Sequence, residues 1–169
     1  MGTVEDSGRG LLVHFLAALA YRTQKALRGA PPGFGAFDPG HRARTPQELV
    51  RHMTSVLGYA RTFFLGGVYR PAPLETLGDE VERFHGMVQE LGALLADGVP
   101  LRGVTIEQLL QGPLADAMTH AGQLALLRRL SGTPVPPENF IAAAIDRHQL
   151  GPEQAPPASP DAEWPERLP

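Results

Sequence analysis

The seventeen prolines of this 169-residue chain are clustered, and their clustering constrains its fold more than any other feature. An interior proline costs a helix about 3 kcal/mol, because it removes a backbone donor and clashes with the preceding turn. Long helices are therefore confined to stretches that lack proline. The five longest of these stretches are residues 1–30, 47–70, 74–99, 114–133 and 138–151.

The first and third stretches carry apolar residues at helical spacing. In the first, Leu12, Phe15 and Leu19 recur every three or four residues, on one face of a helix that should stop near Gly29. In the third, the apolar spacing alternates between four and three, as in the seam of a bundle helix, and Asp97-Gly98 should close it. This seam comprises Leu77, Val81, Phe84, Val88, Leu91 and Leu95.

Two further helices are introduced by capping sequences. Thr45-Pro46-Gln47-Glu48 combines a capping threonine, a proline suited to the first turn and a glutamate that can complete a capping box. Thr105-Ile106-Glu107-Gln108 repeats the box before a helix that meets Pro113, which either kinks that helix or separates a short lead-in turn from it. We expect these helices to end at Gly66-Gly67 and Gly132.

These patterns predict an all-α protein, with one four-helix bundle domain at residues 1–150. No run shows the sustained alternation of a strand, and amphipathic stretches separated by proline and glycine are typical of a bundle. The connection from Gly29 to Thr45 is long for a tight turn between antiparallel helices. We therefore expect a crossover connection and a topology other than simple up-down-up-down.

The last part of the chain should be less regular. A short C-terminal helix is expected after Pro136-Pro137, and residues 151–169, rich in proline, are expected to form a surface tail that Trp164 could anchor. The residues expected on one side of the short helix are Phe140, Ala144 and Ile145.

Charge and cysteine content exclude several classes of partner and site. Fifteen Lys and Arg against eighteen Asp and Glu give a net charge of -3, which argues against nucleic acid and against polybasic attachment to a membrane. The absence of cysteine excludes disulfides, thiolate metal sites and a cysteine nucleophile. Histidine, aspartate and glutamate remain as metal ligands.

One apolar run, residues 11–20, ends in Ala18-Leu19-Ala20 and resembles a signal-peptide cleavage site. The acidic Glu5 and Asp6 before it, and the interrupting His14, contradict that interpretation. No apolar run reaches the ~18 residues that span a bilayer. We therefore expect a cytoplasmic protein without a membrane partner.

A candidate metal site arises from one residue on the second predicted helix and two on the fourth. His52 lies on the same stripe as Leu49 and Met53, so it should point into the bundle. Asp116 and His120 are four residues apart and share a helix face. If these two helices face each other, the three side chains converge as two imidazoles and a carboxylate with open positions, a set suited to Zn, Ni, Fe(II) or Mn.

The alternative for the same residues is a hydrogen-bonded core network without metal, since a buried histidine more often bonds within the core. Glu82 and His85 form an E-x-x-H pattern, but no second copy exists, and a solvated helix edge is expected for His85. Arg128-Arg129 should complement the dipole of their own helix and require no ligand. The remaining histidines, expected to be structural or exposed, are His14, His41 and His148.

Two stretches resemble the DinB-like (YfiT-like) superfamily of metal-binding four-helix bundles. They are the run from Arg44 to Met53 and the run from Asp116 to Gln123, and the resemblance covers roughly residues 11–145. It implies an up-down-down-up bundle with a long crossover. It also implies metal ligation by His52 and by His120, which precedes Gly122-Gln123. The chain departs from the commonest pattern at Asp116, where a histidine is usual, although relatives similar to mycothiol-dependent maleylpyruvate isomerases carry a carboxylate there.

The resemblance implies a metal-dependent enzyme, either a thiol-dependent transferase or isomerase, or a hydrolase. Its partner would be a low-molecular-weight thiol or another small molecule, and the bundle faces are compatible with a homodimer. A bound divalent ion can either lower the pKa of a thiol or activate water. The ligands alone therefore do not distinguish a thiol-dependent enzyme from a hydrolase. The alternative is a non-catalytic bundle, a stress-response or small-ligand-binding protein with a degenerate metal site.

Overall fold

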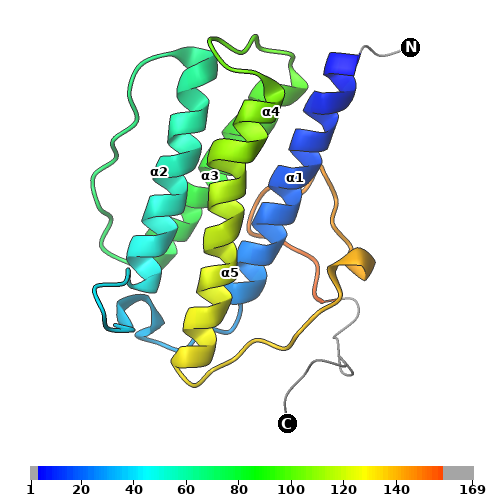
Figure 1. Cartoon of the computed structure of the whole chain (residues 1–169). Helices are drawn as coiled ribbons and strands as arrows, with labels where there is room; N and C mark the ends of the chain where they lie inside the picture. The colour runs from blue at the N-terminus through cyan, green and yellow to red at the C-terminus, as the bar shows by residue number, and fades with distance from the viewer. Residues whose placement is uncertain (1–3, 158–169) are drawn as a thin grey trace.

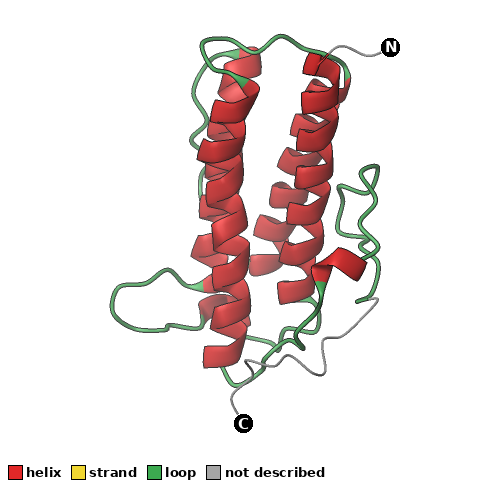
Figure 2. Ribbon diagram, turned by 45° about the vertical axis from the view of Figure 1, so that its right-hand side comes forward, coloured by secondary structure: helices red, strands yellow, loops and turns green. Residues whose placement is uncertain are grey.

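A computed structural model describes residues 4–157, and within that range the chain is all-helical with four long helices. Figure 1 shows the long helices side by side, and Figure 2 shows helices and loops but no strand among the described residues. The predicted all-α class is confirmed. The long helices are α1 (Val4–Leu27), α2 (Pro46–Leu65), α3 (Leu77–Ala96) and α5 (Ala115–Leu130).

The four helices form a closed arrangement in which α1 and α2 lie diagonally across from each other. Both α1 and α2 pack against α3 and α5. In Figure 1 the chain descends through α1, ascends through α2 and again through α3, and descends through α5. This order brings α2 and α5 together, which is the pairing that the candidate metal site requires.

The crossover lies in a different connection from the one expected. Because α2 and α3 both ascend, the chain must return along the whole of a 20-residue helix, about 30 Å, between them. Residues 66–76 do this along the outside of the bundle (Figure 1). The longer connection from Gly29 to Thr45 instead joins two helix ends at the same end of the bundle, and it contains the short 3-10 helix η1 (Phe34–Ala36).

The helix boundaries follow the capping signals. The side chain of Thr45 accepts from the backbone of Glu48, and the carboxylate of Glu48 accepts from the backbone of Thr45. After Leu65 the chain enters the left-handed region at Gly66, with φ of 76°, which a residue with a side chain would rarely adopt. Both ends of α2 are therefore set by local sequence.

Pro113 separates a short lead-in turn from the last long helix, which is one of the two arrangements predicted from the sequence. The lead-in is α4 (Ile106–Leu109), followed by a π-helical turn η2 (Leu110–Leu114). Within that turn Gly112 is non-helical, with φ of -91° and ψ of -106°. The break lets α5 begin at Ala115 in its own direction, so Asp116 lies in its first turn.

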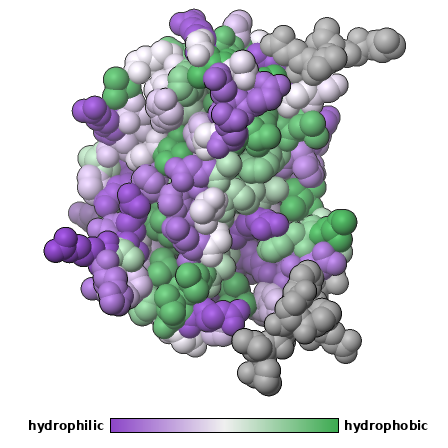
Figure 3. All heavy atoms as spheres, in the orientation of Figure 1, coloured by the Kyte–Doolittle hydropathy of each residue, from purple (hydrophilic) through white to green (hydrophobic). Residues whose placement is uncertain are grey.

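The core lies along the predicted apolar stripes of all four helices. Its members from α1, α2, α3 and α5 include Leu16, Met53, Phe84 and Leu124, all fully buried. On the face that carries α1, α2 and α5, Figure 3 shows purple polar and green apolar residues interspersed. The homodimer stays a prediction.

No helix within residues 4–157 has the length and hydropathy to cross a membrane.

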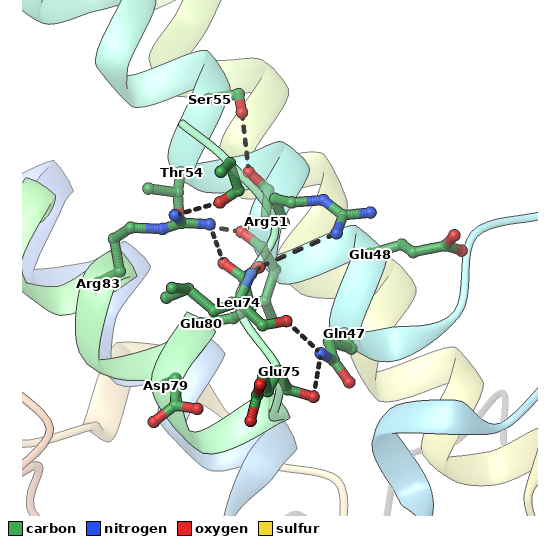
Figure 4. A network of polar contacts seen from close by, with 12 residues as sticks. Gln47, Glu48, Arg51, Thr54, Ser55, Leu74, Glu75, Asp79, Glu80 and Arg83 are labelled. Atoms are coloured by element: carbon green, nitrogen blue, oxygen red, sulfur yellow. Dashed lines mark hydrogen bonds and ion pairs between the residues drawn. The ribbon is translucent and has the colours of Figure 1, made fainter. Parts of the chain in front are cut away.

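A buried network holds the crossover against the bundle (Figure 4). The carboxylate of Glu80, fully buried on α3, accepts from the backbone N–H of Leu74 at 2.9 Å and from the guanidinium of Arg83. Arg51 of α2 approaches the same carboxylate to 4.0 Å. The side-chain amide of Gln47 donates to the carbonyls of Leu74 and of the residue after it. One carboxylate thus links α2, α3 and the segment between them.

Arg128 lies in the last turn of its own helix, as predicted, and it has a second role that was not predicted, because it also caps another helix. It is buried on α5, and its guanidinium donates to the carbonyls of Ala26, Arg28 and Gly29 at 2.9, 3.0 and 3.3 Å. These carbonyls belong to the last turn of α1 and the residues just after it, which lack helical partners. Arg128 therefore completes the C-terminus of α1.

Replacing Arg128 by glutamine should lower the free energy of unfolding by about 2 kcal/mol, because the carbonyls at the end of α1 lose charge-assisted bonds. Urea denaturation measures the change. The matched control is Arg129→Gln, at an exposed position one residue further on, which should shift stability by less than about 0.5 kcal/mol. Equal effects of the two substitutions would contradict the capping role.

The chain after α5 is mostly non-helical. Where a short helix was predicted, only a single 3-10 turn, η3 (Phe140–Ala142), forms, and Ala144 and Ile145 lie outside it. The side chain of Asn139 caps this turn, but Ala143 is already extended, with ψ of 138°. The predicted proline-rich tail is described only as far as residue 157, and Trp164 lies outside the described residues.

His85 is buried, so the prediction of a solvated helix edge is wrong. Only 2% of its surface is exposed, because the segment after η3 folds back over α3. Nδ1 of His85 lies 3.1 Å from the carbonyl oxygen of Leu150, and the side chain of Leu150 packs on Gly92. A Cβ at Gly92 would lie 2.2 Å from Cδ1 of Leu150, so this glycine makes room for the covering segment.

Burial lowers the pKa of His85 below its ordinary 6.5, although the bond to Leu150 opposes the shift. The unfolded chain therefore takes up this proton at a higher pH than the folded protein does. The resulting stability is fully present above about pH 6.5 and is lost as the pH falls through that value, by at most about 1.4 kcal/mol per pH unit. Urea denaturation between pH 8 and pH 5 should show a shallower pH dependence in His85→Gln than in the parent, and identical slopes would contradict the assignment.

Candidate metal centre

The three predicted ligands converge between α2 and α5. His52 lies in the second turn of α2, while Asp116 and His120 lie one turn apart on the face of α5 that packs against α2. One nitrogen of each histidine and one oxygen of Asp116 all lie within 4.8 Å of one another. The structure thus brings together the whole set that the sequence proposed.

The closest two donor atoms are spaced as neighbouring ligands of one ion would be. Nε2 of His120 lies 3.3 Å from Oδ1 of Asp116. Bonds of about 2.0–2.1 Å in a tetrahedral arrangement place neighbouring donors about 3.3 Å apart. The rings of His52 and His120 meet edge to face, with centroids 4.8 Å apart at 75°. The donor set therefore fits a small divalent ion, with His52 closing in from the opposite helix.

Gln123 orients the ring of His120, a role that sequence reasoning did not assign. Its side-chain oxygen Oε1 lies 2.8 Å from Nδ1 of His120, three residues earlier on the same helix. Because an amide oxygen only accepts, this contact is a hydrogen bond when Nδ1 carries the hydrogen, and Nε2, on the side of Asp116, is then the nitrogen that could bind a metal. A metal-binding histidine is commonly held in this way by an acceptor on its other nitrogen. The i, i+3 spacing of His120 and Gln123 was the available signal.

Burial and nearby charge favour the neutral form of His52. Its pKa is lowered first by desolvation and then by the positive charge of Arg44 and by His120, while Asp116 acts in the opposite direction. A neutral imidazole is the form that binds metal. Asp116 is the open side of the site, since its side chain is 51% exposed while that of His120 is 10% exposed.

Two cavities meet at this site and share His52 and Ser55. The first, about 470 Å³, is polar and is bordered by Arg42, Arg44, Glu48 and Arg51, together with prolines of the crossover. The second, about 620 Å³, is mainly apolar. Its other lining residues are Val56, Tyr59, Gln111, Gly112, Pro113 and Asp116. Each of the two cavities beside the open side of the site therefore has room for a small molecule.

The remaining histidines do not join the site. His85 is buried against the C-terminal segment, as described above. His14, His41 and His148 are exposed, as predicted. Comparison of the chain with models of protein families, with curated proteins and with solved structures finds no match.

Replacing Gln123 by leucine should weaken zinc binding by about 10–100-fold, because the His120 ring loses the acceptor that fixes its orientation. Competition with a zinc-sensitive dye measures the affinity. The matched control is Gln89→Leu, because Gln89 is exposed on α3. Gln108 is unsuitable as a control, because it belongs to a capping box. An unchanged zinc affinity in Gln123→Leu, with Gln89→Leu also unchanged, would exclude the orienting role.

Proposed function

We propose that this protein is a metal-dependent enzyme that binds one divalent ion through His52, Asp116 and His120 and acts on small molecules. The observation that carries the proposal is the convergence of the three donor groups from two helices within 4.8 Å, where two cavities meet. Two imidazoles and one carboxylate with open positions suit Zn, Ni, Fe(II) and Mn.

We also propose that the chain belongs to the DinB-like superfamily. In support, the helices run in the up-down-down-up order expected of it, with the crossover between the two parallel central helices. His52, His120 and Gly122-Gln123 occupy the positions of its motif. Asp116 takes the place of the usual histidine, and it lies where a ligand is needed.

A divalent ion in this site would lower the pKa of a water or a thiol bound beside it and so supply a nucleophile at neutral pH. The protein's own residues set the conditions for this. His52 and His120 would supply imidazole nitrogens, and Asp116 would supply the one carboxylate of the ligand set. Ser55 borders both cavities, but its hydroxyl donates to the carbonyl of Arg51 at 3.0 Å. We therefore propose water or a thiol, and not Ser55, as the nucleophile.

The test compares two reactions in protein loaded with Zn, Ni or Mn and in protein stripped by chelator. Hydrolysis of p-nitrophenyl acetate reports on activated water, and transfer of a small thiol to 1-chloro-2,4-dinitrobenzene reports on an activated thiol. We expect metal to raise one of the two rates at least tenfold, and Asp116→Asn to remove that increase while helicity is unchanged. Metal binding without an increase in either rate would favour the non-catalytic bundle.

A further inference from the structure

We propose that the enzyme's substrate is an organic anion, whose carboxylate or phosphate is held by Arg42, Arg44 and Arg51 while its apolar part lies in the second cavity. This inference rests on the proposed metal function and adds the class of molecule that the site accepts. It starts from the charges around the 470 Å³ cavity, which the metal ligands do not require.

The lining of that cavity has two more positive than negative side chains. Its cations are Arg42, Arg44 and Arg51, and its one acid is Glu48. The carboxylate of Glu48 already accepts from the backbone of Thr45 as part of the α2 capping box. A cavity bordered by three guanidinium groups attracts anions, and guanidinium groups match the two oxygens of a carboxylate or phosphate.

Arg42 and Arg44 have no other bonded partner in the described part of the chain. Neither forms a hydrogen bond or an ion pair within 4 Å there, whereas Arg51 also approaches the buried Glu80 (Figure 4). Both side chains are exposed at the cavity rim. The two arginines are thus available to a ligand, and Arg51 is held in place beside them.

The backbone that presents Arg42 is held in an unfavourable conformation. Gly40, His41 and Arg42 are consecutive left-handed residues, with φ of 80°, 54° and 60°. Residues with side chains rarely adopt this conformation outside tight turns. The N–H of Ala43 donates to the carbonyl of Gly40 at 3.0 Å, which closes a turn with His41 and Arg42 at its centre, and this turn places Arg42 at the border of the cavity.

A divalent ion bound at the three ligands would also favour an anionic substrate. A divalent ion carries two positive charges, and Asp116 is the one charged ligand, so the centre stays positive beside the arginines. On the other side of His52, the 620 Å³ cavity offers Val56, Tyr59 and Pro113. The ring of Tyr59 is exposed and packs edge to face on Phe63, 4.8 Å between centroids. A ligand that spans both cavities passes the metal ligands at its middle.

The experiment uses three probes that share one apolar body, titrated calorimetrically into the zinc-loaded full chain. They are 4-phenylbutanoate, its neutral amide 4-phenylbutanamide, and 3-phenylpropyl phosphate. We expect both anions to bind at least tenfold more tightly than the amide, and the tighter of the two anions identifies the preferred acid group. The double substitution Arg42→Gln with Arg44→Gln should remove most of this preference, while Tyr59→Ala should weaken all three probes.

The matched control is Arg102→Gln, an exposed arginine in the connection between α3 and α4, which should leave all three affinities unchanged. Equal binding of the amide and the acids would overturn the inference. An anion preference that persists in the double variant would also overturn it, because the zinc alone would then be the anion receptor. Zinc content is measured in every sample. If the parent does not bind zinc, the proposed function is refuted. If zinc is retained and either of the two contradicting probe results is found, only the anion subsite is refuted.

Discussion

Replacing Glu80 by alanine should lower the free energy of unfolding by about 3–5 kcal/mol, the largest stability effect of any single substitution considered in this protein. The carboxylate is fully buried, and its removal leaves the guanidinium of Arg83 without its anion and the N–H of Leu74 without its acceptor. It also weakens the attachment of the crossover to α3, where the guanidinium of Arg83, which donates to the carbonyl of Ala72 at 2.7 Å, would be left without its carboxylate partner. Urea denaturation followed by circular dichroism measures the loss.

Glu82 is the matched control for this substitution. It lies two residues along the same helix, is exposed and forms no hydrogen bond or ion pair within residues 4–157, so Glu82→Ala should change stability by less than about 0.5 kcal/mol. Glu80→Gln keeps an acceptor for Leu74 but loses the charge, and an intermediate loss is expected. A loss below 1 kcal/mol in Glu80→Ala would mean that the buried network does not hold the crossover.

Replacing His52 by alanine should lower the affinity for zinc by at least about 100-fold, because it removes the only ligand that α2 contributes. The two ligands on α5 remain, and Gln123 still orients His120, but two donors on one helix bind zinc weakly. The metal-free variant should keep its helicity, since His52 is only partly buried and forms no hydrogen bond to any side chain or backbone group within residues 4–157. Competition with a zinc-sensitive dye gives the affinity, and circular dichroism gives the fold.

His14→Ala serves as the control, since His14 is an exposed histidine on α1 outside the site. Its zinc affinity should equal that of the parent. If both histidine variants lowered zinc binding to the same small extent, the metal would be bound non-specifically by surface histidines.

Local signals were sufficient to predict the helices but not the contacts between distant segments. Capping boxes and glycine stops act within one turn of the chain, so the boundaries of α2 at Thr45 and Gly66 could be predicted from the sequence. The burial of His85 depends on a segment some sixty-five residues later, and the exposed edge predicted for it was wrong. The capping of α1 by Arg128 is similarly invisible to periodicity, because the two lie about a hundred residues apart.

The candidate site was predictable because each ligand lies on a helix face that periodicity defines. His52 shares the stripe of Met53, and Asp116 and His120 are one turn apart, so their convergence needed only the pairing of α2 with α5. The arginines beside the site were not predicted, since Arg42 and Arg44 lie in a loop where spacing carries no information about direction. Their approach to His52 depends on the backbone of that loop.

The most direct test of the metal centre is a calorimetric titration of the chelator-treated protein with zinc at pH 7.5. We expect one equivalent bound per chain in the parent and in His14→Ala, and loss of the binding in each of the three ligand variants, His52→Ala, Asp116→Ala and His120→Ala. Binding that is absent in the parent, or that survives unchanged in all three ligand variants, would contradict the metal centre and leave His52, Asp116 and His120 as a polar network between two helices.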